Sequence, residues 1–153
     1  MANSAAVCTS FKQELMGGIH AFGTSVVRAG TGADTFKAAL FLASGSLGAA
    51  TATYTSVTAS EVSGTGYTAG GVTVTNGNAL ANASGTAYWT PSASFAWTTV
   101  TLSTAFDTVL LYNSTQSNKA VAVYTFASQT VTAGNFTLTM PTNDQTNGLL
   151  RIA

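Results

Sequence analysis

Charged residues are scarce in this chain. Only 7% of its 153 residues are charged, with five Lys and Arg against five Asp and Glu, so the formal net charge is zero. An average soluble domain carries about 25%. Five scattered cations cannot neutralise a phosphate backbone, which excludes nucleic acid as an expected partner. A monomer with so few charges is also poorly protected against association, so we expect a surface covered by partners or coated with hydroxyl and amide groups.

Membrane and export signals are also missing. The uncharged stretch over residues 62–106 is interrupted throughout by Thr, Ser, Asn and Gly, so no window predicts a transmembrane helix. No basic amphipathic helix fits a membrane surface. The N-terminus, MANSAAVCTSF, has neither a basic start nor an apolar run. We therefore expect no secretory signal, no membrane partner, and assembly in a cytoplasm.

Cysteine and histidine each occur once, as Cys8 and His20. One cysteine excludes a disulfide within the chain, and one histidine cannot form a His-based metal site by itself. A Cys8–His20 nucleophile pair is formally possible, but no third polar residue stands near it in the sequence to orient it. The simpler interpretation is that His20 is a polar residue at a helix end.

The five acids are far apart in the sequence: Glu14, Asp34, Glu61, Asp107 and Asp144. Asp34 and Asp107 precede predicted strands, where Asp commonly caps a turn. Folding could join two carboxylates into a glycosidase pair, but five acids offer few pairs. Asp144 alone makes a poor calcium site, and the glycine-rich segment 64–71 lacks the Lys-Ser/Thr and the helix of a phosphate-binding loop. We predict a protein that is not an enzyme, with no catalytic, cofactor-binding or metal-binding residues.

Four aromatic residues lie close together in the sequence: Tyr88, Trp89, Phe95 and Trp97. They offer material for a ligand patch, including one that stacks on sugars. Aromatic side chains more often fill a core or a subunit interface, and that is the interpretation we favour.

The N-terminal segment, about residues 8–22, predicts a short helix over residues 11–16. Ser10 can cap this helix, and Gln13 follows at the spacing of a capping box. Apolar side chains recur on one face at intervals of four: Phe11, Leu15 and Ile19. Gly17 and Gly18 predict its end.

From Asp34 onward the pattern changes to strands. Alternation or β-branched residues predict strands over residues 35–42, 53–58, 72–75, 95–102, 108–112, 119–126, 136–140 and 149–152. Asn76-Gly77 is the strongest hairpin signal, with a return strand beginning near Leu80 and Ala81. Short strands at this spacing predict a single all-β domain over residues 1–153, either a β-sandwich or barrel-like, with the short helix packed on it.

Three parts of the chain resemble small virion proteins encoded in the structural-gene clusters of tailed phages. They are CTSFKQEL with GIHAF (residues 8–15 and 18–22), DTFK with EVSGTGY (34–37 and 61–67), and TNGLLRI (146–152). The second is the most specific of the three. The resemblance implies a virion component and carries no catalytic residues.

This resemblance, the low charge and the small size together favour a capsid decoration, or cement, protein. We expect it on the capsid exterior, after assembly in the host bacterial cytoplasm, where it would bridge and stabilise capsomers. The expected partners are the major capsid protein and further copies of the chain, most simply as a homotrimer. Phe11 and Tyr67 are the candidate contacts, and no cofactor is expected. A tail, neck or fibre-associated protein and a host-surface carbohydrate-binding module remain alternatives.

Overall fold

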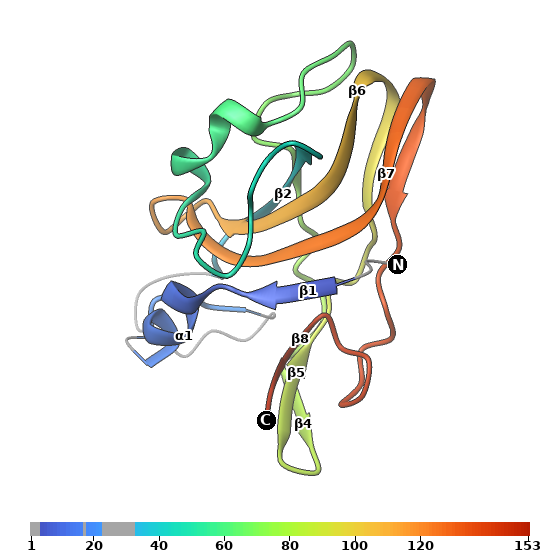
Figure 1. Cartoon of the computed structure of the whole chain (residues 1–153). Coiled ribbons are helices and arrows are strands. Elements are labelled where there is room, and N and C mark those ends of the chain that lie inside the picture. The colour runs from blue at the N-terminus through green and yellow to red at the C-terminus, as the bar shows by residue number, and fades with distance from the viewer. Residues whose placement is uncertain (1–3, 17, 23–32) are drawn as a thin grey trace.

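The computed structural model describes residues 4–16, 18–22 and 33–153, apart from the side chains of Lys12, Gln13 and Met16. Strands hold 48% of the chain and helices 8%, which confirms the predicted all-β class. The strands form two antiparallel sheets, one in the order β1-β7-β6-β2-β3 and one in the order β4-β5-β8 (Figure 1). Within the described residues these sheets do not close into a barrel, so the sandwich-like alternative is the one that fits.

The large sheet contains β1 (Ser4–Val7), β2 (Phe36–Leu42), β3 (Val72–Thr73), β6 (Phe95–Asn113) and β7 (Lys119–Leu138). The small sheet contains β4 (Ala81–Ala83), β5 (Thr86–Trp89) and β8 (Leu150–Ile152). The helix α1 (Thr9–Met16) follows β1, and two 3-10 helices, η1 (Tyr54–Ser56) and η2 (Thr58–Ser60), follow β2.

The helix matches the sequence prediction at its C-terminal end and differs at its start. It begins at Thr9, so Ser10 lies inside the first turn and is not the N-cap; the side chain of Gln13 lies outside the description. After Met16 the chain turns at Gly18, whose φ is +65°. This left-handed conformation is the usual reason for a glycine just beyond a helix.

β6 and β7 form one long hairpin through the molecule (Figure 1). The sequence predicted four strands here, but the structure joins them into two strands of 19 and 20 residues. The pairing register shifts at several bulges, and Thr99 and Ala133 adopt positive φ values of 54° and 46°. A bulge inserts an extra residue without ending the pairing, so the alternation in the sequence breaks where the strand continues.

The Asn76-Gly77 pair does not form the predicted hairpin. β3 pairs with β2 in the large sheet, whereas β4 belongs to the small sheet, so residues 74–80 cross from one sheet to the other. This crossing segment is held by Ser92, whose backbone N–H and hydroxyl both donate to the carbonyl of Thr75, at 3.0 and 3.2 Å.

The tight hairpin lies between β4 and β5 instead. Its two turn residues, Ser84 and Gly85, have φ values of 49° and 81°. Positive φ at both central positions is the signature of a type I′ turn, whose twist matches that of the flanking strands. Serine in the first position is a weaker signal than asparagine, which explains why the sequence pointed to the wrong pair.

Residues 53–58 were predicted as a strand but hold η1 and the start of η2. The Thr53 hydroxyl accepts the backbone N–H of Ser56 at 3.2 Å, and the Ser56 hydroxyl donates to the Thr53 carbonyl at 2.7 Å. Such local side-chain bonds compete with a strand ladder for the same backbone groups.

The core is built on both faces of β2. Phe36 stacks on Phe22 from the segment after α1, with ring centroids 4.4 Å apart. Phe41, on the other face, packs against Tyr54 of η1, with centroids 6.4 Å apart. Because β2 is covered on both sides, most of its side chains are buried, and only Lys37 and Leu42 are partly exposed. The sequence showed only one of these two faces, the one carrying Phe36, Ala38, Leu40 and Leu42.

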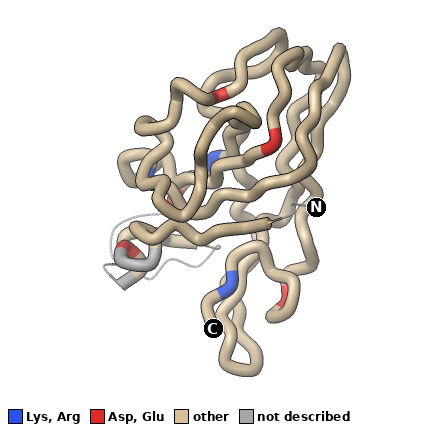
Figure 2. The backbone as a smooth tube through the Cα atoms, viewed as in Figure 1, with Lys and Arg blue, Asp and Glu red and all other residues tan. Residues whose placement is uncertain are grey.

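Charge is sparse over the whole described surface. Figure 2 shows the Lys, Arg, Asp and Glu residues as isolated positions rather than as patches. No helix in the described part of the chain is long and apolar enough to cross a membrane.

Candidate functional site

The candidate site begins where α1 ends, because the helix end aims His20 into the protein. The N–H of Ile19 donates to the carbonyl of Glu14 at 3.0 Å, and the N–H of Gly18 donates to that of Leu15 at 3.0 Å. These two bonds form a Schellman motif, which reverses the chain over the helix end. His20 follows directly, with a side chain that is fully buried.

Both ring nitrogens of His20 have partners. Nε2 lies 2.7 Å from Oε2 of Glu14, and Nδ1 lies 3.1 Å from the amide nitrogen of Asn113. The orientation of the Asn113 amide is set by its own oxygen, which accepts the backbone N–H groups of Thr115 and Gln116, each at 3.1 Å. Asn113 therefore donates to Nδ1, and His20 is the neutral tautomer that carries its proton on Nε2.

Further hydrogen bonds extend from the two partners of His20. On one side, the Lys119 ammonium lies 2.6 Å from Oε1 of Glu14. On the other, the Asn113 amide nitrogen donates to Oδ2 of Asp34 at 2.8 Å, and that oxygen also accepts the N–H of Ala21 at 2.9 Å. We call Glu14, His20, Asp34, Asn113 and Lys119 the His20 network. It ties α1 and the segment after it to the start of β2 and to both ends of the β6–β7 turn.

The ionisation of the network follows from burial and from these bonds. Burial by itself would raise the pKa of Glu14, but the hydrogen bonds and charges of Lys119 and His20 outweigh it, so the pKa is lowered. Burial lowers the pKa of His20, and the opposing effect of the Glu14 carboxylate does not compensate. At neutral pH the network is thus a Glu14–Lys119 ion pair beside a neutral imidazole.

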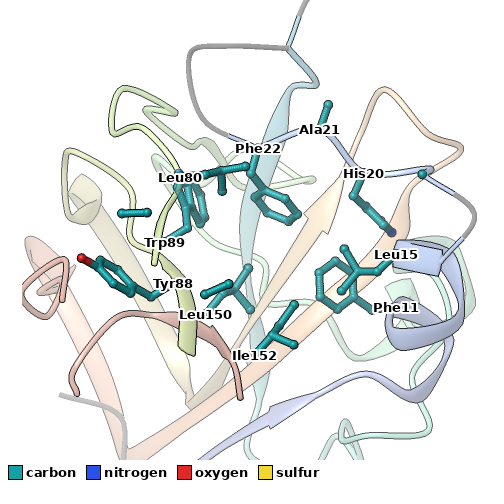
Figure 3. A pocket seen from close by; sticks show the side chains of 13 residues that line it. Phe11, Leu15, His20, Ala21, Phe22, Leu80, Tyr88, Trp89, Leu150 and Ile152 are labelled. Atoms are coloured by element: carbon teal, nitrogen blue, oxygen red, sulfur yellow. The ribbon is translucent and has the colours of Figure 1, made fainter. Parts of the chain in front are cut away.

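A pocket of about 360 Å³ lies beside the network, between α1 with the segment after it and the small sheet (Figure 3). His20 and Phe22 stand on one wall, and Trp89 and Leu150 on the other. The described lining residues include no Lys, Arg, Asp or Glu: Phe11, Leu15, Gly18, His20, Ala21, Phe22, Leu80, Ala81, Ala87, Tyr88, Trp89, Leu150 and Ile152. Because both His20 nitrogens are already bonded, the walls offer a ligand mainly apolar contact.

The pocket has an exposed aliphatic rim. Leu80 and Ile152 are 57% and 52% exposed, and in the described chain they are the large hydrophobic residues most open to solvent. Both line the pocket. Exposed apolar side chains that gather around a concave apolar surface are typical of an interaction site, whereas single ones are not informative.

The two contact residues predicted from the sequence, Phe11 and Tyr67, both pack against other parts of the chain. Phe11 is 1% exposed and forms part of the pocket wall. Tyr67 is half-buried, and its hydroxyl donates to Glu61 at 2.7 Å and accepts the backbone N–H of Leu40 at 3.1 Å. A contact through either residue stays a prediction, and of the two only Phe11 belongs to the pocket.

The glycine-rich segment 64–71 is held closely to the sheet. The Glu61 carboxylate accepts the hydroxyl of Tyr54 at 2.6 Å, the hydroxyl of Tyr67 and the N–H of Gly70 at 2.7 Å. The hydroxyl of Tyr112 in turn donates to the Gly70 carbonyl at 2.8 Å. The segment is thus an irregular loop that these bonds hold in place, and its glycines allow close packing against the sheet.

Cys8 and His20 do not form a nucleophile pair. Cys8 is fully buried, and burial, with the charge of Glu14, raises the pKa of its thiol to about 11. The two ring nitrogens of His20 are hydrogen-bonded to Glu14 and Asn113. A thiolate is the reactive form of cysteine, so this thiol is unreactive at neutral pH.

The two remaining acids have local roles. Asp144 accepts the hydroxyl of Thr142 and the N–H groups of Thr146 and Asn147, and the amide of Asn147 and that hydroxyl lower its pKa most. Asp107 does not precede a strand as predicted but lies inside β6, where it accepts the hydroxyl of Thr108 at 2.7 Å. Among the described residues no group of three or more His, Cys, Asp and Glu could hold a metal ion.

The two tryptophan rings are not accessible for stacking on a sugar. Trp89 and Trp97 are 2% and 3% exposed, so neither ring face is open on the described surface. Trp97 packs on Phe136 and Trp89 on Phe22, which is the core role that the sequence favoured.

The chain matches no protein-family model, no curated protein and no solved structure. The geometry and the chemistry of its own residues therefore carry the functional argument.

Proposed function

We propose that this chain is a structural subunit of a tailed-phage virion, and specifically a capsid decoration subunit that sits on the head exterior and bridges capsomers. Such a subunit binds the assembled shell and stabilises it by mass action, because the binding free energy is added to that state alone. The sequence resemblance to small virion proteins and the neutral surface both support this role.

One observation carries the proposal: Leu80 and Ile152, the most exposed large hydrophobic residues of the described chain, border an apolar pocket whose described lining carries no charged side chain. An aliphatic side chain of the major capsid protein is the occupant that this chemistry fits. A charged segment would be left unpaired there and would lose its hydration. Contact through neutral surfaces also predicts binding that changes little with salt.

The stoichiometry of purified phage particles tests the role. Hundreds of copies per particle are expected for a decoration subunit, whereas six or twelve copies would replace the proposal with a neck or tail position. Particles that lack the chain should release their DNA at a lower temperature than complete particles, at both low and high salt. Equal release temperatures would contradict the cement role.

The contact surface is tested with charge variants. Leu80→Asp and Ile152→Asp place a carboxylate on the pocket rim, and each is expected to weaken binding to depleted particles at least tenfold. Thr104→Asp puts the same charge on an exposed position of β6 outside the pocket lining and is the matched control. Equal binding by all three variants would place the capsid contact on another surface.

Self-association remains part of the proposal. Edge strands expose unpaired backbone groups that tend to recruit another chain. In the described sheets β1, β3, β4 and β8 are edges. A homotrimer would match the local three-fold positions of an icosahedral shell. Light scattering at micromolar concentration should give three times the mass of the chain, and a sharp monomer mass would count against a preformed trimer.

A further inference from the structure

We propose that His20 is an acid-sensitive switch: its neutral ring holds residues 18–22 against the β6–β7 turn, and protonation of the ring releases them and opens one wall of the pocket. The inference concerns the isolated protein, and it stands or falls independently of the virion role. Each ring nitrogen of His20 already has a hydrogen-bond partner among the described residues, Glu14 at Nε2 and Asn113 at Nδ1.

A second proton on the His20 ring would face a hydrogen-bond donor. Nε2 already carries the proton that it donates to Glu14, so a further proton must bind Nδ1. Nδ1 faces the amide nitrogen of Asn113 at 3.1 Å, and this nitrogen is a donor. Protonation therefore turns a hydrogen bond into a contact between two N–H donors in a buried site.

Asn113 cannot adapt by turning its amide over. Its oxygen accepts the backbone N–H groups of Thr115 and Gln116, and its nitrogen also donates to Asp34. A flip would break all of these bonds and would place the amide oxygen 2.8 Å from a carboxylate oxygen of Asp34. Asn113 is fully buried, so no solvent would replace the lost partners.

Among the described residues, the charged groups that act on the ring are Glu14, Asp34 and Lys119, from three different parts of the fold. Glu14 of α1 and Asp34 before β2 favour the imidazolium, while Lys119 of β7 disfavours it. Burial has the largest effect and also disfavours the charged ring, so the pKa of His20 is below its usual value near 6.5. β6 contributes Asn113, which does not titrate. Neutral His20 is thus the form that the closed structure selects.

Release of residues 18–22 would disturb the packing of the core and the wall of the pocket together. Phe22 follows His20 by two residues and packs on Phe36 and on Trp89, with centroids 4.4 and 4.9 Å away. Figure 3 shows His20 and Phe22 on the same wall, facing Trp89 and Leu150. When this wall moves, Trp89 loses its contact with Phe22 and becomes more exposed to water.

The sign of the pH dependence follows from linkage. The open form binds a proton at His20 with the ordinary pKa, and the closed form binds it only at lower pH. The ratio of open to closed molecules therefore rises tenfold for each pH unit below about 6.5, until the closed form also becomes protonated. Above pH 6.5 the ratio is constant.

The test reads Trp89 fluorescence between pH 7.5 and 5.0 in a Trp97→Phe background, where Trp89 is the only tryptophan. We expect a reversible red shift of the emission as the pH falls. His20→Gln, which cannot gain a charge, should lack this shift. Glu14→Gln keeps an acceptor for Nε2 but removes the charge that favours the imidazolium in the closed form. The closed form is then protonated only at still lower pH, so the rise in the open fraction should begin at the same pH and continue further as the pH falls. An unchanged transition in His20→Gln would overturn the proposal.

A second measurement uses the unmodified chain, so that the proposal can be tested even if a variant fails to fold. Nitrogen-15 chemical shifts of the ring should show a proton on Nε2 and none on Nδ1 at pH 7.5. Hydrogen exchange should show that the Ala21 amide, bonded to Asp34, opens tenfold more often per pH unit below 6.5. A proton on Nδ1 at pH 7.5, or exchange protection at Ala21 that is the same at pH 5.5 and 7.5, would exclude the switch.

Discussion

Phe22 stacks on Phe36 with ring centroids 4.4 Å apart and an interplanar angle of 16°, and so connects the segment after α1 to the central strand β2. Phe22 is 7% exposed and also contacts Trp89 and Phe11. Deleting such a ring removes buried area and leaves a cavity. We expect Phe22→Ala to lower the free energy of unfolding by about 3–5 kcal/mol, measured by urea denaturation. Leu80→Ala, at an exposed position, should stay within about 0.5 kcal/mol, and similar losses in both variants would contradict the packing described.

The Tyr67 hydroxyl joins Glu61 to the backbone of β2. Tyr67→Phe removes its bond to Glu61 and leaves the N–H of Leu40 without this partner, so we expect a loss of about 1–3 kcal/mol in urea denaturation. Tyr88→Phe is the matched control, because its hydroxyl has no hydrogen bond to any residue that the structure describes, and it should change stability by less than about 0.5 kcal/mol. Equal effects of the two substitutions would mean that segment 64–71 is not held through Tyr67.

Three glycines should respond differently to alanine. At Gly71, with φ of +72°, a methyl group would overlap the carbonyl oxygen of Ala38, and we expect Gly71→Ala to prevent folding or to cost more than about 3 kcal/mol. At Gly85, with φ of +81° and open space around it, only backbone strain remains, and the cost should be about 1–2 kcal/mol. At Gly48, which has neither constraint, alanine should be neutral or stabilise by up to about 1 kcal/mol. Thermal unfolding of the three variants gives the order, and any other order would contradict the turn geometry.

Alkaline pH should unfold the protein steeply. Burial raises the pKa of four tyrosines: Tyr54, Tyr67, Tyr112 and Tyr124. The nearby Glu61 carboxylate raises the pKa of the first three further, that of Tyr112 to about 12. In the unfolded chain all four ionise near pH 10, so the folded state retains protons that the unfolded state has lost. The contribution of these tyrosines to the free energy of unfolding is therefore complete below pH 10 and is lost as the pH rises through 12.

Tyrosinate absorbance and circular dichroism, followed together from pH 9 to 13, check this prediction. We expect these tyrosines to ionise in one step that coincides with the loss of strand signal. Ionisation that is complete near pH 10 while the strand signal persists would show that these hydroxyls are open to solvent. Tyr124→Phe should reduce the slope of stability against pH by up to one proton.

The sequence predicted those parts of the fold that depend on neighbours in the chain. The helix, its end at Gly18, and the strand over residues 119–126 follow from spacing within a few residues. The merged strands β6 and β7 did not follow from it, because residues such as Thr99 and Ala133 break the alternation while the ladder continues. The Asn76-Gly77 signal was overruled by the pairing of β3 and β4 with different sheets.

The His20 network escaped sequence reasoning for a related reason. His20 and Asn113 are 93 residues apart, and Glu14 and Lys119 are 105 residues apart. No local spacing connects such residues before the strands are paired. The available signal was indirect. Glu14 lies on a helix with an otherwise apolar face, and a carboxylate in such a place needs a partner. In a chain with so few charges and a single histidine, few residues could be that partner.

The long β6–β7 hairpin also sets the order in which the chain can fold. Its turn pairs Asn113 with Lys119, so the loop that must close is short, whereas β1 meets β7 only across 121 residues, at Ser4 and Thr125. Loop closure costs more entropy as the loop lengthens, and contacts between distant residues slow folding. β1, α1 and β2 leave the ribosome before β6 and β7 but can pair with them only when these two strands have been made. The N-terminal third, which carries one wall of the pocket, is thus expected to dock late, with the completed hairpin as its template.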